Sequence, residues 1–386
     1  MSKRRTLDSF FQPLRKKQQL SPENGTAQRN GILNNHRVSG LSQDSIRPEE
    51  AKILEDGSEG VGLQDARELS SHTTYPFPIP YLPSNIQSML GFAPAAEPSV
   101  IKDQPDLDLL YFQPYIPKEI ARDLFEFLRQ ELFFYRVKYM IKRGGVETLI
   151  NTPRFTTVFG VDETSRFTAD GSLVDSSTGR PVPKDRYRCK PRPIPQCLNE
   201  LRKLTEGSTN TTYNFCLVNY YASGSDSISY HSDDERFLGS NPSIASFSLG
   251  AKRDFLMKHK PPTERPGAPG MSTATSTLSS ETAGQPLKFP LASGDMILMR
   301  GPTQATWLHS IPKRKGRESD RGRINITFRK AMVRGGTENY YTYNVGMSAN
   351  ADENGGRTGE KGEVYRWDGR REEMVQWLPP EIKSEN

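Results

Sequence analysis

Three residues in this chain have the types and the spacing of metal ligands. The chain has only five histidines, and His231 stands two residues before Asp233 in the stretch ISYHSDDE. Residues two apart in a β-strand point to the same face, so both side chains can contact one cation at the strand end. His309 follows in TWLHSIP, just after the strand-like run GDMILM. The pattern predicts a metal site formed by His231, Asp233 and His309.

The chemistry of such a site depends on the metal. Two imidazoles and one carboxylate form the facial triad of non-haem Fe(II) oxygenases, which leaves coordination positions open for co-substrates. A His-x-Asp pair alone is weak evidence, because a chance pair or a metallohydrolase has the same residues. A metallohydrolase would hydrolyse its substrate without oxygen, so these alternatives differ in the reaction they predict.

A second polar group lies on one face of the predicted strand RINITFRK. At a period of two, one face carries Arg323, Asn325, Thr327 and Arg329, and the other carries Ile324, Ile326 and Phe328. Buried arginines are unfavourable unless an anion neutralises them, and a guanidinium binds a carboxylate through paired hydrogen bonds. A dicarboxylate co-substrate fits this face, with Asn219 and Tyr221 of LVNYY as neutral partners. The alternative is an internal ion pair with Asp254 or Asp295.

Helices followed by many short strands must position these residues. Residues 117–135 carry apolar side chains at helical spacing after a proline, RVKYMIKR-GG-VETLIN predicts a β-hairpin, and 194–206 predicts a helix that stops at Gly207. Strands are predicted at 212–221, 227–233, 244–250, 253–259, 287–291, 295–300 and 323–333. This order indicates a mainly β, α+β fold, an antiparallel jelly roll or a small barrel.

Composition divides the chain into three parts. Hydrophobic residues make up 34% and the mean hydropathy is -0.69, values typical of a globular domain that carries disordered segments. We expect a disordered arm at 1–105, a folded domain at 106–335 with a flexible insertion at 260–286, and an extension at 336–386.

Three cysteines without a CxxC pair indicate a reducing compartment. No apolar run approaches the roughly 20 residues of a membrane span.

The net charge of +6 is concentrated in basic runs at 1–20 and 313–330. Such runs favour a polyanionic partner or a nuclear import signal, although a solvated charged surface is the commoner explanation for one run. In the first run, Leu7, Phe10 and Phe11 stand at i, i+3 and i+4, so one helical turn would present them together.

The motif order resembles a known family. NYY, ISYHSDDE, SIASFSLGAKRDFLMKHK, GDMILM, WLHS and RINITFRK are similar to the AlkB-type Fe(II)/2-oxoglutarate-dependent DNA-repair dioxygenases, above all their nuclear eukaryotic branch. The resemblance covers about 106–333 without the insertion. It implies a double-stranded β-helix that holds Fe(II) through His231, Asp233 and His309. The residues that it implies for 2-oxoglutarate are Asn219, Tyr221, Arg323, Thr327 and Arg329.

The same resemblance implies an enzyme and its reaction. With O2 as the further co-substrate, the family hydroxylates the N-methyl group of bases such as 1-methyladenine and 3-methylcytosine, and formaldehyde is lost. It implies that Asp234 and Glu235 face the substrate, where carboxylates would favour a cationic methylated base over a neutral one. The alternative for this pair is a solvated acidic turn.

The implied substrate is alkylated DNA, and we expect duplex DNA. A base inside a duplex must be flipped out to reach such a pocket. The hairpin, with Tyr139 on its apolar face, resembles the family's base-flipping hairpin, although it would equally fit an ordinary hairpin packed on the core. Arg154, in the PRF motif, is a candidate DNA contact. Phe159, Phe167 and Tyr187 are candidates for aromatic residues of a substrate lid.

The N-terminal arm implies a partner and a location. Its segment 4–11, RRTLDSFF, resembles the peptide that docks on the sliding clamp (PCNA), except that Arg4 stands where glutamine is usual. We therefore expect clamp binding through Leu7, Phe10 and Phe11, and a nuclear protein. Two alternatives remain open: the same chemistry on RNA or single strands, and a non-catalytic adaptor for DNA and the clamp on a degenerate oxygenase fold.

Overall fold

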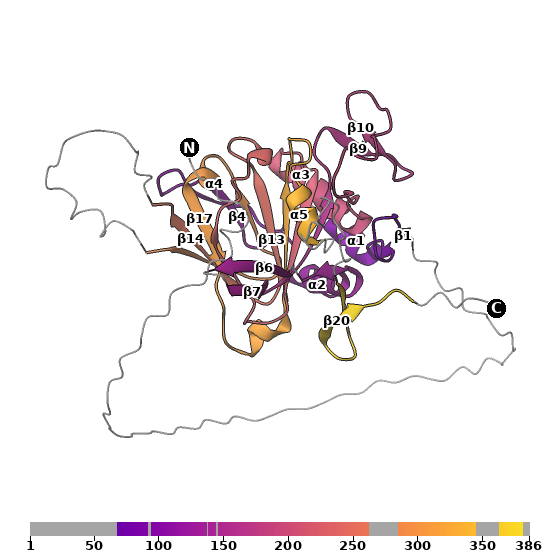
Figure 1. Cartoon of the computed structure of the whole chain (residues 1–386). Coiled ribbons are helices and arrows are strands. Elements are labelled where there is room, and N and C mark those ends of the chain that lie inside the picture. The colour runs from indigo at the N-terminus through magenta and orange to yellow at the C-terminus, as the bar shows by residue number, and fades with distance from the viewer. Residues whose placement is uncertain are drawn as a thin grey trace, which may run out of the picture. The chain divides into compact units, whose positions relative to one another are not determined.

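The computed structural model describes residues 68–91, 94–136, 138–143, 146–261, 285–344 and 363–380, and only the backbone within 138–151. Most of its strands belong to a large sheet and a small sheet (Figure 1). The large sheet has the order β20 (Glu373–Trp377), β19 (Val364–Asp368), β5 (Phe134–Tyr135), β8 (Phe155–Gly160), β11 (Phe215–Tyr221), β18 (Arg323–Arg329), β13 (Ile244–Gly250), β16 (Met296–Met299), β4 (Leu109–Phe112) and β3 (Ser99–Ile101). The small sheet has the order β12 (Ile228–His231), β17 (Trp307–Ile311), β14 (Arg253–His259) and β15 (Leu287–Leu291).

Both sheets are antiparallel throughout, as a jelly roll requires. Non-consecutive strands are neighbours, since β11 pairs with β8 on one side and with β18 on the other. In the small sheet β12 pairs with β17, and in that register His231 lies opposite His309. The mainly β jelly roll expected from the sequence is confirmed.

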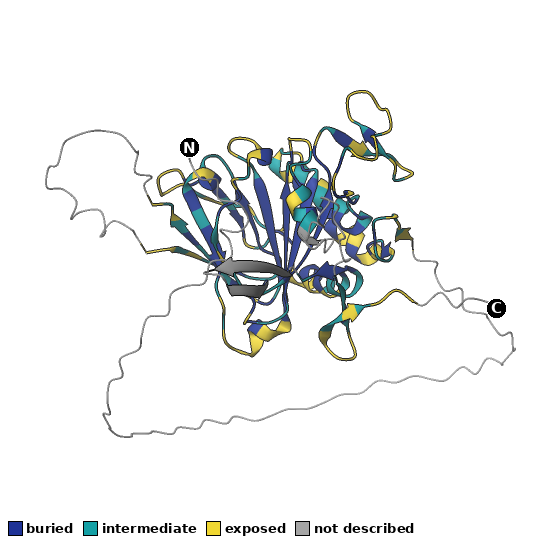
Figure 2. Ribbon diagram, in the orientation of Figure 1, coloured by how far each residue is buried: buried dark blue, intermediate teal, exposed yellow. Residues whose placement is uncertain are grey.

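The alternation of strand β18 explains how one strand serves both the core and a polar site. Ile324, Ile326 and Phe328 are fully buried in the hydrophobic core. The residues between them point to the opposite face, where they line a pocket. The central strands are buried along almost their whole length, as Figure 2 shows.

Helix α2 (Lys118–Glu131) packs against this core, as its apolar spacing predicts. It begins after Pro117, whose fixed φ suits a helix start, and it buries Ile120, Leu124 and Leu128. The remaining helices are α1 (Ser84–Leu90), α3 (Gln196–Thr209), α4 (Thr303–Thr306) and α5 (Glu338–Asn344), with 3-10 turns at Arg236–Leu238 and Arg317–Arg321. Three two-stranded pairs complete the described elements: β1 (Leu69–Ser70) with β2 (Ile79–Pro80), β6 (Lys138–Arg143) with β7 (Val146–Asn151), and β9 (Ser165–Phe167) with β10 (Leu173–Asp175).

Three predicted element ends are wrong. The helix predicted at 117–135 ends at Glu131, because Phe134 and Tyr135 form strand β5. Helix α3 continues through Gly207 to Thr209, and it ends at Asn210 in the left-handed conformation with φ 51°. Gly207 costs helix stability but does not forbid a helix, and the buried face of α3, with Leu198, Leu201 and Thr205, packs beyond it. The last central strand ends at Arg329 and not at residue 333.

The predicted domain limits at 106 and 335 also need correction. Strand β3 lies before residue 106 and pairs with β4 at one edge of the large sheet. Strands β19 and β20 lie beyond residue 335 and extend the other edge next to β5. Both strands lie almost entirely in the aromatic stretch YRWDGRREEMVQW of the extension. Trp367 in this stretch is 9% exposed and belongs to the core, so this part of the extension packs on the domain.

Several predictions fall outside the described residues. These are the clamp-binding segment 4–11, most of the arm 1–105, and 262–284 of the insertion. Within the described residues, no helix is long and apolar enough to cross a membrane.

The position of Trp367 gives a test of the corrected boundary. We expect Trp367→Ala to lower the free energy of unfolding by roughly 3–5 kcal/mol, the usual cost of deleting a buried aromatic side chain, in urea denaturation of the full chain. Leu378→Ala in the same tail is the control, because Leu378 is 72% exposed and should change stability by less than about 0.5 kcal/mol. Equal effects would contradict a structural role for β19.

Candidate metal and co-substrate site

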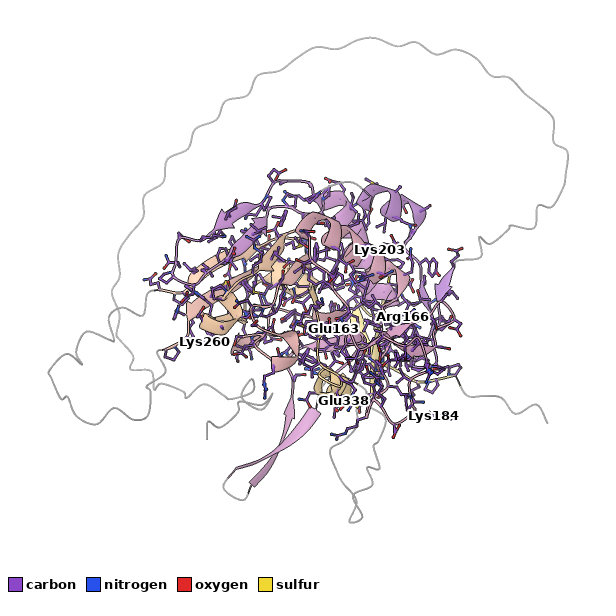
Figure 3. The ribbon with its side chains drawn as sticks, turned by 90° about the horizontal axis from the view of Figure 1, so that it is seen from above. Glu163, Arg166, Lys184, Lys203, Lys260 and Glu338 are labelled. Atoms are coloured by element: carbon purple, nitrogen blue, oxygen red, sulfur yellow. The ribbon has the colours of Figure 1, made fainter. Side chains whose placement is uncertain are left out.

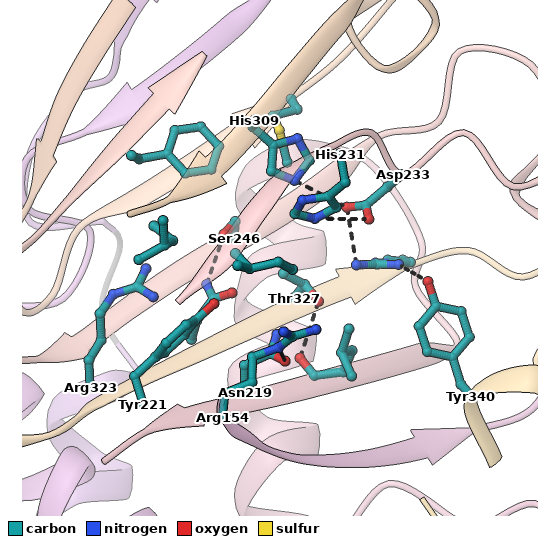
Figure 4. Close-up of a pocket in the computed structure, with 17 residues that line it drawn as sticks. Arg154, Asn219, Tyr221, His231, Asp233, Ser246, His309, Arg323, Thr327 and Tyr340 are labelled. Carbon is teal, nitrogen blue, oxygen red and sulfur yellow. Dashed lines mark hydrogen bonds and ion pairs between the residues drawn. The ribbon is translucent and has the colours of Figure 1, made fainter. Parts of the chain in front are cut away.

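One pocket contains the metal ligands and the co-substrate residues that the sequence predicts (Figure 4). Residues of both sheets line it: Arg154, Leu217, Asn219, Tyr221, Ile228, His231, Asp233, Ser246, Phe255, Met299, His309, Ile311, Arg323, Asn325, Thr327, Arg329 and Tyr340. The pocket therefore joins the predicted metal ligands and the predicted co-substrate residues in one space.

His231, Asp233 and His309 converge as metal ligands do. One ligand atom from each lies within 4.8 Å of the others. Nε2 of His231 is 4.0 Å from Oδ1 of Asp233, and Nε2 of His309 is 3.8 Å from Oδ2 of the same carboxylate. The register of β12 and β17 places the two imidazoles opposite each other, and Asp233 follows directly after β12.

The protonation states also suit a cation. Burial lowers the pKa of His309 to about 3, and it lowers the pKa of His231 as well, so both imidazoles are neutral at pH 7. Burial raises the pKa of Asp233, but the charge of Arg329 and the two imidazoles outweigh it, and the net shift is downward. Neutral imidazoles beside an ionised carboxylate are what metal binding needs.

Neighbouring groups hold the three ligands in place. Nδ1 of His231 donates to the Ser229 carbonyl at 2.8 Å, which leaves Nε2 as the nitrogen without a proton. The backbone N–H of Asp233 donates to Oε1 of Gln304 at 2.8 Å. Phe255 stacks on His309 with ring centroids 5.3 Å apart. The geometry and chemistry of this donor set fit a divalent cation such as Fe(II).

Arg323 is a buried cation with hydrogen-bonding capacity left over. Its side chain is 1% exposed, and burial lowers its pKa to about 10, so it is still charged at pH 7. Nη2 donates to Oγ of Ser248 at 2.8 Å, whereas Nε and Nη1 have no hydrogen-bond partner among the described residues. Buried donors without partners are rare in proteins, and a ligand carboxylate would satisfy them.

The alternative of an internal ion pair with Asp254 or Asp295 is wrong for Arg323, whereas Arg329 does pair with an aspartate, Asp233. Asp254 pairs with Lys288 at 3.0 Å. The carboxylate of Asp295 accepts a hydrogen bond from the Tyr111 hydroxyl at 3.0 Å. Neither aspartate lines the pocket.

The other residues predicted for 2-oxoglutarate line the same pocket. Asn219 accepts a hydrogen bond from Nε of Arg154 at 3.1 Å. The Tyr221 ring lies 5.2 Å from the guanidinium carbon of Arg323. The Thr327 hydroxyl donates to the Leu217 carbonyl at 3.1 Å.

Arg329 lies at the metal end of the pocket. Its Nη2 is 3.1 Å from Oδ2 of Asp233, and its Nη1 donates to the Tyr340 hydroxyl at 2.8 Å. Burial lowers the pKa of this guanidinium, but Asp233, Tyr340 and Glu235 together outweigh it, and the net shift is upward. Arg329 is thus charged, and it touches a metal ligand while it lines the co-substrate pocket.

The predicted substrate residues have different environments. Asp234 is exposed and pairs with Lys260 at 2.8 Å. Figure 3 labels Lys260 on the left side of the ribbon. Glu235 accepts a hydrogen bond from the Tyr340 hydroxyl, and burial, then Asp233, raises its pKa. Arg154 lines the pocket beside Asn219. The side chain of Tyr139 lies outside what the structure describes.

The three lid candidates have other contacts. Phe159 is fully buried in the core, so it is no lid residue. Phe167 packs edge-on against His72. The Tyr187 hydroxyl hydrogen-bonds Asp162 at 3.1 Å and Ser165 at 2.9 Å.

Two residues at the site were missed by the sequence analysis. Gln304 supports the backbone of Asp233 from helix α4, and Tyr340 contacts Arg329 and Glu235 from helix α5. Neither belongs to a motif. Gln304 is 71 residues from Asp233, and Tyr340 is 11 residues from Arg329 and 105 from Glu235, so no strand or helix periodicity links them to these partners.

Comparison with known proteins agrees with this geometry. The model of the 2OG-Fe(II) oxygenase superfamily matches residues 108–329, more than half of the chain. The chain therefore belongs to the 2OG-Fe(II) oxygenase superfamily. Members of this superfamily use Fe(II), 2-oxoglutarate and O2, and the pocket has residues that fit the metal and the dicarboxylate.

Within the superfamily the chain is of the AlkB type, because its relatives are AlkB homologues. It is 31% identical over 227 residues to the DNA oxidative demethylase ALKBH2 of Arabidopsis thaliana. This alignment covers 58% of this chain and 67% of the relative. It is 38% identical over 143 residues to the human DNA oxidative demethylase ALKBH2, and the alignment covers 37% of this chain and 49% of that relative. It is 41% identical over 129 residues to the mouse alpha-ketoglutarate-dependent dioxygenase alkB homolog 3, and the alignment covers 33% of this chain and 40% of that relative. The last two alignments span less than two thirds of those relatives.

Loss of one imidazole should abolish tight metal binding. We expect His309→Ala to weaken Mn(II) binding by more than about tenfold in calorimetric titration, because removal of even an outer partner of a metal ligand weakens binding roughly 10- to 100-fold. His259→Ala is the matched control, since His259 is exposed and lies outside the pocket. Unchanged binding by His309→Ala would place the metal elsewhere.

Arg323 should decide the affinity for the dicarboxylate. We expect Arg323→Gln to raise the Kd for 2-oxoglutarate roughly 10- to 100-fold in the Mn(II)-loaded protein, since a hydrogen bond to a charged group contributes about 1.5–3 kcal/mol. Calorimetry is the measurement, and Arg317→Gln, at an exposed position outside the pocket, is the control. An equal rise of the Kd in both variants would indicate that the lower positive charge of the protein weakens binding, and not the loss of a specific contact.

Proposed function

We propose that this protein is an oxidative demethylase that repairs N-alkylated bases, of the 1-methyladenine and 3-methylcytosine type, in DNA. The observation that carries the proposal is the pairing, within one pocket, of the three converging metal ligands with the unsatisfied guanidinium of Arg323. The names of two relatives, DNA oxidative demethylase ALKBH2, support DNA as the substrate.

The chain's residues bind and orient the reactants. His231, Asp233 and His309 hold the iron, and Arg323 holds the distal carboxylate of 2-oxoglutarate with Asn219, Tyr221, Thr327 and Arg329 as further contacts. The bound Fe(II) supplies, with 2-oxoglutarate and O2, the oxidation of the N-methyl carbon, after which the hydroxymethyl product releases formaldehyde. Asp233 and His309 are buried, which limits the access of water to the reacting groups.

The carboxylates that follow Asp233 support a cationic substrate. Asp234 is exposed, and Glu235 lies beside the pocket residues Arg329 and Tyr340. Negative charge near the site favours a methylated base that carries a positive charge over the neutral base. In this proposal Asp234 and Glu235 select the lesion, and Arg154 and Tyr139 contact the nucleic acid.

The proposal includes duplex DNA as the preferred form. The β6–β7 hairpin supports it, since an antiparallel hairpin with Tyr139 in its first strand could fill the gap left by a flipped base. The basic arm supports a nuclear location and recruitment to a sliding clamp through Leu7, Phe10 and Phe11.

The decisive experiment is repair of a synthetic duplex with a single 1-methyladenine or 3-methylcytosine. We expect the full chain with Fe(II), ascorbate and 2-oxoglutarate to remove the methyl group, measured by mass spectrometry, and to release succinate. His231→Ala should do neither, because it lacks a metal ligand.

Matched single-stranded DNA and RNA separate the substrate alternatives. Faster repair of the duplex is expected, and faster repair of RNA would move the substrate assignment to RNA. Succinate without demethylation would refute the proposed substrate but keep the iron site. Neither product, with iron bound, would favour the non-catalytic adaptor.

A further inference from the structure

Helix α5 brings to the pocket a tyrosine that lies beyond the stretch matched by the family model. That stretch ends at residue 329, whereas Tyr340 lines the pocket from α5 (Figure 4). Its ring packs against Phe215, with ring centroids 5.4 Å apart, and against Phe237 at 6.1 Å. The ring is thus fixed by aromatic neighbours, and its hydroxyl reaches polar groups.

The Tyr340 hydroxyl connects two charged side chains. It accepts a hydrogen bond from Nη1 of Arg329 at 2.8 Å and donates one to Oε1 of Glu235. The other terminal nitrogen of Arg329, Nη2, lies 3.1 Å from Oδ2 of Asp233. A continuous chain of contacts therefore runs from the metal ligand Asp233 through Arg329 and Tyr340 to Glu235.

Helix α5 is held so that Tyr340 keeps this position. The Glu338 carboxylate accepts from the backbone N–H of Arg188 at 2.6 Å. The hydroxyl of Tyr341, the next residue after Tyr340, donates to the Gly160 carbonyl at 2.6 Å and accepts from the Arg192 N–H at 3.0 Å. Tyr341 is 1% exposed. These contacts attach α5 to strand β8 and to the segment before α3.

The contact of Tyr340 with Nη1 matters because a guanidinium tends to bind a carboxylate with two nitrogens. If Arg329 did so with Asp233, it would take up both oxygens of a carboxylate that the metal needs. The Tyr340 hydroxyl accepts from Nη1, and Nη2 lies 3.1 Å from Oδ2 of Asp233, so the two terminal nitrogens contact different groups. The arginine then stays beside the co-substrate pocket, which it also lines.

We propose that Tyr340 is a positioning residue that sets Arg329 for 2-oxoglutarate and, through the same hydroxyl, fixes Glu235. The role toward 2-oxoglutarate rests on the superfamily assignment, and the role toward Glu235 rests on the proposed function. Tyr340 touches neither the metal nor the substrate in this assignment. It acts through Arg329 and Glu235.

The test is a binding titration without nucleic acid. We expect Tyr340→Phe to raise the Kd for 2-oxoglutarate in the Mn(II)-loaded full chain roughly two- to tenfold, the effect of one typical hydrogen bond. The phenylalanine ring keeps the packing on Phe215 and Phe237. Calorimetry gives the Kd, and thermal unfolding reports stability.

Tyr341→Phe is the matched control, because it removes a buried hydroxyl from the neighbouring residue of the same helix. It is expected to lower Tm without changing the Kd for 2-oxoglutarate. An unchanged Kd in a folded Tyr340→Phe protein, or an equal rise in both variants, would overturn the proposal. Because no demethylation is measured, failure of the proposed substrate leaves this test intact.

A second variant covers the case in which Tyr340→Phe does not fold. Glu235→Leu leaves α5 unchanged but removes the acceptor that orients the Tyr340 hydroxyl, and it is expected to raise the same Kd by a smaller factor. An unchanged Kd would count against the proposal. Where both single variants fold, the double variant should have the same Kd for 2-oxoglutarate as Tyr340→Phe alone. If the two increases in Kd multiply in the double variant, the two residues act independently.

Discussion

The buried ion pair between Arg329 and Asp233 is the interaction on which the rest of the site depends. The two groups lie 3.1 Å apart and both are almost fully buried. A charge in such a place is tolerated only with a partner. Arg329 comes from the large sheet, and Asp233 follows a strand of the small sheet. The pair therefore holds the metal end of the pocket together across the two sheets, and it keeps Asp233 ionised beside two neutral imidazoles.

The rest of the fold provides what that pair requires. Strand β18 buries an apolar face in the core and presents its polar face to the pocket, so that Arg323 and Arg329 both reach the same space. Arg323 has Nε and Nη1 left for a ligand carboxylate, whereas both terminal nitrogens of Arg329 contact protein groups and only its Nε has no partner among the described residues. We therefore expect the two arginines to serve the two ends of one dicarboxylate, with the metal at the end of Arg329.

Local spacing was enough to predict the metal ligands, the polar face of β18 and most central strands, because a period of two fixes which side chains share a face. It could not predict the contact of Gln304 with Asp233, 71 residues away, or that of Tyr340 with Glu235, 105 residues away. Nor could it place β3, β19 and β20 in the sheet. These strands, at or next to the edges of the sheet, are only three to five residues long, and their pairing with distant strands defines them. At Gly207 a local stop signal was overridden by the packing of α3.

A crystal structure of the full chain with Mn(II) and 2-oxoglutarate, prepared without oxygen, tests the central claim most directly. The account predicts one metal ion bound by His231, Asp233 and His309, and one 2-oxoglutarate whose distal carboxylate contacts Nε or Nη1 of Arg323. A metal bound elsewhere, or an Arg323 paired with a protein carboxylate while 2-oxoglutarate lies outside the pocket, would contradict it.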